Sequence, residues 1–267
     1  MKLPLLNGSL DQTDFFIYTA ADSAYFDIHA IPLINSVIEN TSYGVHVHIY
    51  NPTSNQLEFC KNINRVSFTW EEFDQTQFQS AIDKWSCADL SGESLSRRNR
   101  MLGTKVVDKS QSLNDNVKVW LQKTYYACVR FIRLAELLQK PVPFLAIDVD
   151  GIVRDSFVCQ FDDNKDFYLH AKEKGGHLAG AILGTTSQQS VNFLQELANE
   201  LCNEFENDNI YWFLDQHCLD KIVPKYNKGY LPLSYIDWYM KPDSAIWSAK
   251  GKRKELQVFK HEQRKYL

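Results

Sequence analysis

The chain has 267 residues, a formal net charge of −4 at pH 7, 44% hydrophobic residues and 23% charged residues, which is an ordinary globular composition. The acidic balance argues against nucleic-acid binding, because phosphate contacts need a basic surface. No apolar run approaches the roughly 20 residues that cross a bilayer, so we expect no transmembrane segment. The 6 cysteines are dispersed without a CxxC pair, which favours reduced thiols in a cytoplasmic protein.

The first half of the chain predicts strands alternating with a helix. The expected elements are a strand at residues 14–20, a helix at 28–38, and strands at 45–50 and 65–70. Pro32 must lie in the first turn of that helix or kink it. The polar residues 86–116 predict a long loop, and loops of that length are usually functional or disordered. We therefore expect this loop to take part in acceptor binding.

The second half continues the alternation. The expected elements are a helix at residues 125–138, a strand at 144–147, a strand at 178–183, a helix that Ser187 caps, a strand at 210–214, a helix at 216–223 that Asp215 caps, and a strand at 245–247 before a basic tail. Strands that alternate with helices predict an α/β fold with a mostly parallel sheet flanked by helices.

Two aspartates follow the apolar strand at 144–147, in the motif Asp148-Val149-Asp150. Ligands of open α/β sheets bind beyond the carboxyl ends of the strands. Two neighbouring carboxylates repel unless a cation lies between them, and oxygen ligands favour Mg²⁺ or Mn²⁺. The motif thus predicts a metal-assisted diphosphate site. The alternative is a solvated strand end.

The same residues allow a second interpretation. Asp148-Val149-Asp150-Gly151-Ile152-Val153 resembles the first motif of haloacid-dehalogenase-type phosphatases, in which the first aspartate is the nucleophile and the second a general acid and base. That family places the motif near its N-terminus and needs a later Gly-Asp pair. Here 147 residues precede the motif, and no Gly-Asp pair follows it.

Short motifs in a fixed order, from Phe15 to Lys254, resemble the GT-A-fold glycosyltransferases, especially the glycogenin and bacterial galactosyltransferase-like group. The resemblance implies one GT-A domain over residues 1–267, with a nucleotide-binding half at about 1–150 and a sugar and acceptor half at about 151–267. It implies transfer of a hexose from a nucleoside diphosphate sugar, UDP-linked, to an unknown hydroxyl, with retention of anomeric configuration. A non-catalytic module that binds nucleotide-sugars is a third alternative.

The resemblance assigns the nucleotide to the turn after the first strand. Within Tyr18-Thr19-Ala20-Ala21-Asp22, it implies that Ala20, Ala21 and Asp22 contact the base and ribose, with Tyr25 stacking nearby. Asp22 could instead cap a helix. The family also places an arginine on the next long helix, facing the donor. Arg130 fits that position best, and Arg133 is the second choice, although Arg133 also has the i,i+3 spacing of an ion pair with Glu136.

The sugar-binding motifs come later in the chain. His177-Leu178-Ala179-Gly180-Ala181 resembles the family's Asn-Ala-Gly strand, where Ala179 and Gly180 let the sugar approach the backbone, or simply pack closely in a core strand. Leu178 replaces the family's asparagine. Asp215 and Gln216 match the family's Asp-Gln pair, which faces the sugar and the anomeric carbon and is the implied catalytic pair.

The basic tail resembles the family's His-x-x-Gly-x-x-Lys motif. Gly251 would let the loop approach the diphosphate, and Lys252 and Lys254 would neutralise it. A solvated basic tail is the alternative. Ser248 stands where the family has a histidine that ligates the metal, and a hydroxyl is a poorer ligand. Asp148 and Asp150 are therefore the expected ligands of a weakly held Mn²⁺ or Mg²⁺.

Two histidines on the strand at 45–50 form a further candidate pair. His46 and His48 have the i,i+2 spacing that places both on one face of a strand. Because no third ligand is evident, we expect a pair on the strand surface rather than a metal site.

Overall fold

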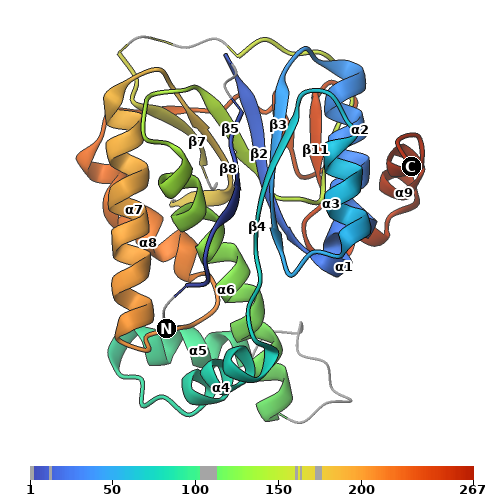
Figure 1. Cartoon of the computed structure of the whole chain (residues 1–267). Helices are drawn as coiled ribbons and strands as arrows, with labels where there is room; N and C mark the ends of the chain where they lie inside the picture. The colour runs from blue at the N-terminus through green and yellow to red at the C-terminus, as the bar shows by residue number, and fades with distance from the viewer. Residues whose placement is uncertain (1–2, 12–13, 103–112, 160–161, 163, 172–175) are drawn as a thin grey trace.

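The computed structural model describes residues 3–11, 14–102, 113–159, 162, 164–171 and 176–267. Within these ranges an eight-stranded sheet in the order β1-β4-β3-β2-β5-β8-β7-β9 forms the centre, and a three-stranded sheet in the order β10-β11-β6 lies beside it (Figure 1). The strands are β1 Asn7–Ser9, β2 Phe16–Asp22, β3 Gly44–Tyr50, β4 Val66–Glu71, β5 Phe144–Ile147, β6 Gly151–Val153, β7 Phe167–Ala171, β8 His177–Gly184, β9 Lys228–Tyr230, β10 Ile236–Asp237 and β11 Ile246–Ser248. Neighbours β4, β3, β2 and β5 run parallel, whereas β8 is antiparallel to β5 and β7, so the predicted mostly parallel sheet is confirmed.

Helices cover both faces of the large sheet. One face packs against α4, α6, α7 and α8, and the other against α2, α3 and the small sheet (Figure 1). The helices are α1 Ser23–Tyr25, α2 Ile31–Asn40, α3 Ser54–Lys61, α4 Gln75–Ser86, α5 Gly92–Leu102, α6 Leu113–Leu137, α7 Gln188–Glu206, α8 Leu214–Ile222 and α9 Gln257–Arg264, with a π-helical turn at Phe26–Ala30 and 3₁₀ turns at Val223–Lys225 and Gly251–Glu255. The large sheet is therefore a buried middle layer.

The central strand β2 shows how the sequence encodes this layering. Phe16 and Tyr18 belong to the apolar cluster under α4, α6, α7 and α8, whereas Ile17 and Ala21 belong to the cluster under α2 and α3. Successive side chains of a strand point to opposite faces. Because both faces are covered, the strand reads as a nearly continuous apolar run.

Most predicted elements are present. The strands predicted at 45–50, 65–70, 144–147, 178–183 and 245–247 correspond to β3, β4, β5, β8 and β11. Pro32 lies in the first turn of α2, which a π-helical turn precedes. Ser187 caps α7, and its Oγ accepts a hydrogen bond from the backbone N–H of Gln189 at 3.1 Å.

The prediction of a loop over 86–116 is wrong where the structure describes that stretch. It contains α5 and the first residues of α6, and residues 103–112 lie outside the described part of the chain. The segment looked like a loop because α5 is anchored by a charged side chain: Arg98 is buried and donates hydrogen bonds to the carbonyls of Ala88, Trp85 and Ile210. A polar anchor leaves no apolar periodicity to detect.

The strand predicted at 210–214 and the cap predicted at Asp215 are also wrong. The backbone of Phe213 has a positive φ of 68°, so the chain turns there and α8 begins at Leu214. Phe213 occupies the capping position, and Asp215 lies within the first turn, where its Oδ1 accepts from the backbone N–H of Gln216 at 2.8 Å. The apolar run resembled a strand because Ile210, Tyr211 and Leu214 are buried in the core.

The two histidines of β3 are not at the surface. His46 and His48 are both fully buried, because α4 and α6 cover that face of the sheet. The nitrogens of His46 lie 2.9 Å from Ser67 Oγ and 3.0 Å from Thr69 Oγ1, on the neighbouring strand β4. The pair is a hydrogen-bonded part of the core.

Two further expectations concern the chain as a whole. All 6 cysteines are free thiols. None of the helices in the described ranges combines the length and hydrophobicity that crossing a membrane requires.

Candidate functional site

The acidic motif lies where the two sheets meet. Asp148 directly follows β5, and its backbone N–H donates to the carbonyl of Gly180 at 3.2 Å. Asp150 directly precedes β6, and its carbonyl accepts from the N–H of Ala249, at the end of β11, at 3.1 Å. Both carboxylates are therefore carried by backbone that is fixed on each side.

Arg130 of α6 joins the predicted site residues to one another. Its Nη1 lies 2.5 Å from Asp148 Oδ1, and its Nη2 lies 3.0 Å from the carbonyl oxygen of Ala179 and 3.6 Å from Asp215 Oδ2. These partners come from the end of β5, from β8 and from α8. One guanidinium thus holds together segments far apart in the sequence.

Gly180 has a steric role beside Asp148. A Cβ at position 180 would lie 2.6 Å from Asp148 Oδ2, closer than such atoms approach in proteins. The carboxylate therefore occupies the space that any larger residue would need. A larger residue at position 180 would therefore displace the Asp148 carboxylate.

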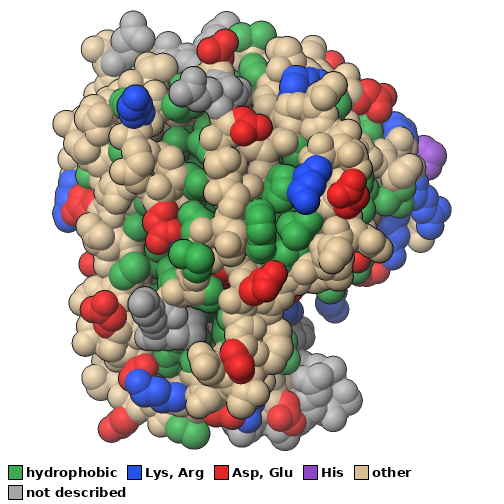
Figure 2. Space-filling model, in the orientation of Figure 1, with side chains coloured by type: hydrophobic (Ala, Val, Ile, Leu, Met, Phe, Trp, Pro, Cys, Tyr) green, Lys and Arg blue, Asp and Glu red, His purple; other side chains and the backbone are tan. Residues whose placement is uncertain are grey.

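The basic tail reaches the same site. Lys254 lies in the 3₁₀ turn Gly251–Glu255, and its Nζ is 2.6 Å from Asp150 Oδ2 and 4.9 Å from the ring centroid of Tyr25. Figure 2 shows lysine and arginine side chains gathered at the edge of the molecule over α9. The tail is therefore part of the site wall, at least through Lys254.

These groups line a cavity of about 350 Å³. Of the predicted residues, the structure places Ala20, Asp22, Tyr25, Arg130, Asp148, Asp150 and Lys254 in its wall. Asp22 also caps α1, since its Oδ1 accepts from the N–H of Tyr25 at 2.8 Å. The volume falls within the range of pockets for small ligands.

Sequence reasoning missed one wall of the cavity. Val119, Gln122, Lys123 and Tyr126 line it from α6, on the helix face that continues to Arg130. Their spacing of three and four residues was a readable signal, but the helix was predicted to begin only at residue 125. Trp212, from the turn before α8, was missed because that turn was predicted to be a strand.

The remaining predicted residues do not line this cavity in the described structure. Ala21 points to the opposite face of β2, into the cluster under α2. Gln216 is buried in α8, next to Asp215. Gly251 begins the 3₁₀ turn with a φ of +59°, which favours glycine, and Lys252 is exposed.

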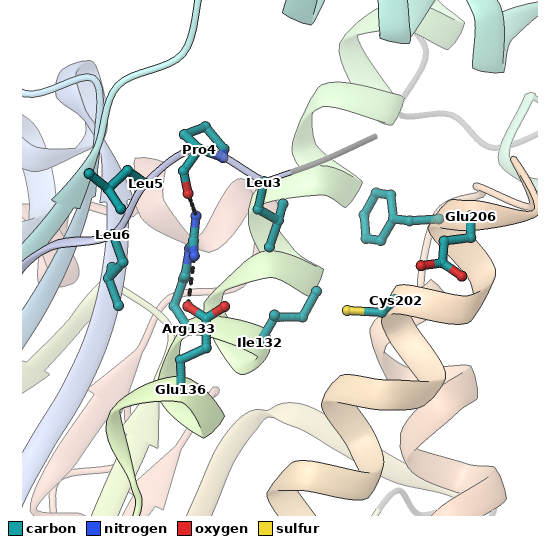
Figure 3. A pocket seen from close by; sticks show the side chains of 10 residues that line it. Leu3, Pro4, Leu5, Leu6, Ile132, Arg133, Glu136, Cys202 and Glu206 are labelled. Carbon is teal, nitrogen blue, oxygen red and sulfur yellow. Dashed lines mark hydrogen bonds and ion pairs between the residues drawn. The ribbon is translucent and has the colours of Figure 1, made fainter.

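Arg133, the second choice for the donor-facing arginine, lies elsewhere. It lines a separate cavity of about 670 Å³ beside the N-terminal segment, where it contacts Pro4 and Glu136 (Figure 3). It also forms an ion pair with the buried Glu71 of β4. Arg130 alone of the two lies at the acidic motif.

Burial and charge act against each other on the carboxyl groups of the site. Burial favours the neutral form of Asp148, but Arg130 and the tail lysines hold the pKa of that carboxyl below its ordinary value. For Asp150 burial prevails over Lys254, and repulsion from Asp148 adds to it, so its pKa rises to about 6. Burial also raises the pKa of Asp215, in spite of Arg130. Further positive charge would stabilise this cluster.

Two unsatisfied oxygens bear on the expected metal. Asp150 Oδ1 and Ser248 Oγ are buried without a hydrogen-bond partner in the described structure. Ser248 pairs with Gly151 across β11 and β6, one residue from Asp150. Such hard oxygen donors are what Mg²⁺ and Mn²⁺ prefer, so these residues fit a divalent cation.

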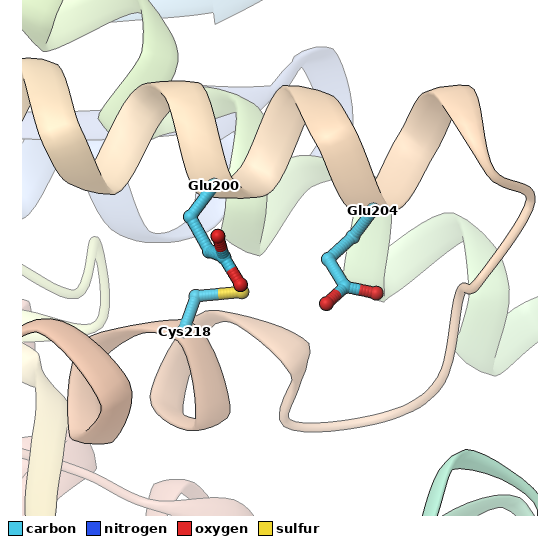
Figure 4. Close-up of side chains that lie close together, drawn as sticks. All are labelled: Glu200, Glu204 and Cys218. Carbon is cyan, nitrogen blue, oxygen red and sulfur yellow. The ribbon is translucent and has the colours of Figure 1, made fainter.

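A second cluster of possible metal ligands is already neutralised. Glu200, Glu204 and Cys218 lie close together between α7 and α8 (Figure 4). Lys221 Nζ lies 2.8 Å from Glu200 and 3.0 Å from Glu204, and burial raises the pKa of the Cys218 thiol. An ammonium group therefore occupies the place that a metal would take.

Comparison with known proteins shows the fold. No protein-family model matches the sequence, and no curated protein does. Among solved structures, the galactosyltransferase LgtC in complex with donor and acceptor sugar analogues is similar at a TM-score of 0.53 and 12% identity, over 94% of this chain and 95% of that one. The glycosyltransferase GlyE of Streptococcus pneumoniae TIGR4 is similar at 0.56 and 13%, over 94% of this chain and 60% of that one.

The bifunctional glycosyltransferase WbbM, in its apo form, is similar at a TM-score of 0.53 and 15% identity, over 92% of this chain. The chain spans 48% of the length of WbbM, about half. Identities this low show the fold alone. The chain has the GT-A glycosyltransferase fold, as its motifs suggested.

Proposed function

We propose that this chain transfers a hexose from a nucleoside diphosphate sugar, UDP-linked, to a hydroxyl acceptor. The observation that carries the proposal is the meeting of Asp148, Asp150, Arg130 and Lys254 at one cavity of a GT-A fold. Diphosphate is the ligand chemistry that suits a cluster of paired cations and carboxylates beside a cavity of this size.

In this proposal the nucleoside lies against Asp22, Tyr25 and Tyr126, all of which line the cavity, and the tyrosine rings suit stacking with a base. The diphosphate then lies against Arg130 and the acidic motif, which line the same cavity. In this proposal the sugar lies toward Ala179 and Asp215, both of which contact Arg130.

The chain's own residues account for most of the chemistry. Arg130 fixes the Asp148 carboxylate, and Gly180 leaves room for it. Lys254 exchanges its partner from Asp150 to the diphosphate when the donor binds, and stabilises the charge that develops on the leaving group. A bound Mn²⁺ or Mg²⁺ would be held by Asp148 and Asp150 and would supply further charge stabilisation there.

Replacement of the acidic motif tests the proposal. Asp148→Asn and Asp150→Asn should each lower the turnover of UDP-glucose or UDP-galactose at least about a hundredfold, because a group that stabilises the transition state is lost. The matched control is Asp243→Asn, which changes an exposed aspartate and should leave turnover intact. Circular dichroism checks that each variant is folded.

Three results would contradict the proposal. One is full turnover in Asp150→Asn. Another is binding of nucleotide-sugars without turnover of any, which indicates the binding module. The third is hydrolysis of an aryl phosphate that is lost in Asp148→Asn, which indicates the phosphatase. Where turnover is found, NMR of the anomeric proton of the product tests the expected retention of configuration.

A further inference from the structure

A further cavity, called the second cavity below, has a volume of about 690 Å³, and Lys250 in its wall acts electrostatically on Asp148 of the candidate site. His170 of β7 and Leu178 of β8 form one wall, and Trp238 and Tyr239, which follow β10, form another. Lys250, at the start of the tail, closes the side toward the acidic motif. Neither the acidic motif nor Lys254 lines this cavity, so it is a separate space.

The wall of this cavity is positively charged. Lys241, Lys250 and Arg253 line it, and no carboxylate does so in the described part of the chain. Among the described residues none of these three cations has a salt-bridge partner within 4.0 Å, a contrast to Lys254 on the same tail. Two of them lie over aromatic rings: Lys250 Nζ is 5.8 Å from the centroid of Trp238, and Arg253 Cζ is 4.5 Å from that of Tyr239. Cations held on aromatic faces remain available to an anion.

The aromatic residues of the cavity wall differ in exposure. The indole Nε1 of Trp238 is buried without an acceptor in the described structure, and Trp238 is 4% exposed. An indole nitrogen can only donate. By contrast, the rings of Tyr239 and Tyr230 are 64% and 57% exposed, and both line the cavity. Exposed tyrosine rings suit the apolar face of a sugar.

The position of this cavity connects it to the candidate site. Lys250 is close enough to Asp148, Asp150 and Asp215 to favour their ionised forms. Leu178 is adjacent to Ala179, whose carbonyl accepts the hydrogen bond from Arg130. Lys250 and the neighbouring residues Leu178 and Ala179 therefore link the wall of the second cavity to the candidate site.

We propose that this cavity binds the acceptor, and that the acceptor carries an anionic group, a phosphate or a carboxylate, near the hydroxyl that receives the sugar. Lys241 and Arg253 pair with that group, since ammonium and guanidinium groups bind such anions by charge-assisted hydrogen bonds. Tyr239 and Tyr230 contact the sugar ring. This inference rests on the proposed function, because it takes the first cavity as the donor site.

Ligand-observed NMR with simple sugars tests it. Methyl glucoside, methyl glucuronide and glucose 6-phosphate are titrated against the full chain in the presence of UDP and Mn²⁺. An anionic sugar should bind at least about tenfold more tightly than the neutral one, the value of one charge-assisted hydrogen bond. The anionic sugar that binds more tightly then identifies the recognised group, a carboxylate for methyl glucuronide or a phosphate for glucose 6-phosphate.

Charge removal gives the matched comparison. In the double variant Lys241→Gln and Arg253→Gln, the anionic sugars should lose at least about tenfold in affinity and the neutral sugar should lose little. Lys140→Gln, at an exposed position after α6, is the control and should change neither. An unchanged melting temperature of the double variant excludes misfolding.

The outcomes separate this inference from the proposed function. Equal binding of neutral and anionic sugars, or equal losses of both in the double variant, overturns the inference even if donor turnover is found. Anion binding that depends on Lys241 and Arg253, in a protein that turns over no nucleotide-sugar, supports an anion site and contradicts the proposed function.

Discussion

At the scale of single residues, the two oxygens of each carboxylate in the acidic motif have different surroundings. Arg130 contacts Asp148 through Oδ1, while Oδ2 lies against Gly180. Lys254 contacts Asp150 through Oδ2, while Oδ1 is buried without a partner. One oxygen of each pair is thus fixed by the protein. The other oxygen lies against Gly180 in Asp148 and has no hydrogen-bond partner in Asp150. Small substitutions beside these oxygens should therefore have large effects on donor turnover.

Gly180→Ala is the smallest such change. The added Cβ would lie 2.6 Å from Asp148 Oδ2, so the carboxylate must move, and we expect its contact with Arg130 to weaken. We expect donor turnover to fall at least about tenfold, because misplacement of a catalytic group by a fraction of an ångström is costly. Kinetics with the best nucleotide-sugar measures it. Turnover equal to that of the parent chain would show that Gly180 only packs the strand.

The buried histidines predict a pH dependence of stability. Burial lowers the pKa of His46 to about 3, and it holds that of His48 well below the ordinary value. A group with a depressed folded-state pKa contributes stability above its unfolded pKa of about 6.5, and this contribution is lost as pH falls toward the folded value. For one histidine the loss is up to about 1.4 kcal/mol per pH unit.

Urea unfolding of the parent chain and of His46→Gln at about pH 7.5 and about pH 5 measures this effect. The variant should lose less stability on acidification than the parent. The difference between the two chains is the informative quantity, because Asp150, whose pKa is raised to about 6, has the opposite pH dependence in both. Equal losses in the two chains would contradict the assignment to His46.

Much of the site could be predicted at this scale because its motifs are local in sequence. Asp148 and Asp150 follow an apolar strand, and Lys254 stands three residues after a glycine. The partners of these groups could not be predicted, because no pattern pairs Arg130 with Asp148 or Lys254 with Asp150. Nor could burial of His46 and His48 be predicted, since it depends on hydroxyl groups of another strand, which hydrogen-bond both ring nitrogens of His46 and one of His48.

At the scale of elements, helix α6 connects the site to the core. One face carries Val119, Gln122, Tyr126 and Arg130 along the cavity. Another face carries Arg133, whose guanidinium pairs with the buried Glu71 of β4 and the partly exposed Glu136. The position of Arg130 at the acidic motif therefore depends on the fixed position of the whole helix on the sheet.

Removal of Arg133 should destabilise the chain. Arg133→Met leaves Glu71 buried and unpaired, and the loss of one partner of a buried ion pair costs about 3–5 kcal/mol. Urea unfolding measures the change. Glu136→Ala is the matched control: it removes the 43% exposed partner of the same arginine and should cost no more than about 1 kcal/mol. Equal small losses in both variants would show that the buried pair contributes little.

Elements were predictable where burial follows a regular period. Helix α7 has such a period and was predicted, and the parallel strands were predicted from their short, nearly continuous apolar runs. The start of α6 was missed, although Val117, Trp120, Leu121 and Tyr125 are buried with helical spacing, because polar residues surround them. The sequence of helix α5 shows little apolar periodicity, since the helix is anchored by the guanidinium of Arg98. The turn at Phe213 depends on a left-handed backbone that no local motif marks.

At the scale of the whole molecule, the tail closes the site because α9 docks on the small sheet. Phe259 is fully buried in a cluster with Ile152, Trp247 and Tyr266. The tail runs from β11 to α9, which lies at the side of the molecule beyond α2 (Figure 1), and between the two Lys254 contacts Asp150. Lys254 reaches Asp150 only while this docking holds, so tail packing and donor binding should be coupled.

Phe259→Ala tests this coupling. Loss of the buried ring should cost up to about 3–5 kcal/mol of stability. Release of Lys254 should also raise the KM for the donor more than it lowers kcat, because the proposed function assigns this lysine to neutralising the diphosphate. Thermal unfolding and donor kinetics measure the two effects. The control Val258→Ala changes a neighbouring side chain that is 50% exposed, and it should change neither the stability nor the KM. A Phe259→Ala variant that is destabilised but has an unchanged KM would show that tail packing and donor binding are not coupled.

The central claim is that Asp148, Asp150 and the tail lysine together bind a nucleoside diphosphate sugar. Melting temperatures with UDP-glucose, UDP-galactose and UDP, with and without Mn²⁺, test it most directly, because a ligand that binds only the folded chain stabilises it by mass action. We predict a rise of several degrees for at least one UDP-sugar, from about 2.7 kcal/mol at a hundredfold excess over Kd. The rise should be absent from the double variant Asp148→Asn and Asp150→Asn. The account is contradicted if no UDP-sugar shifts the parent chain, or if the double variant shifts equally.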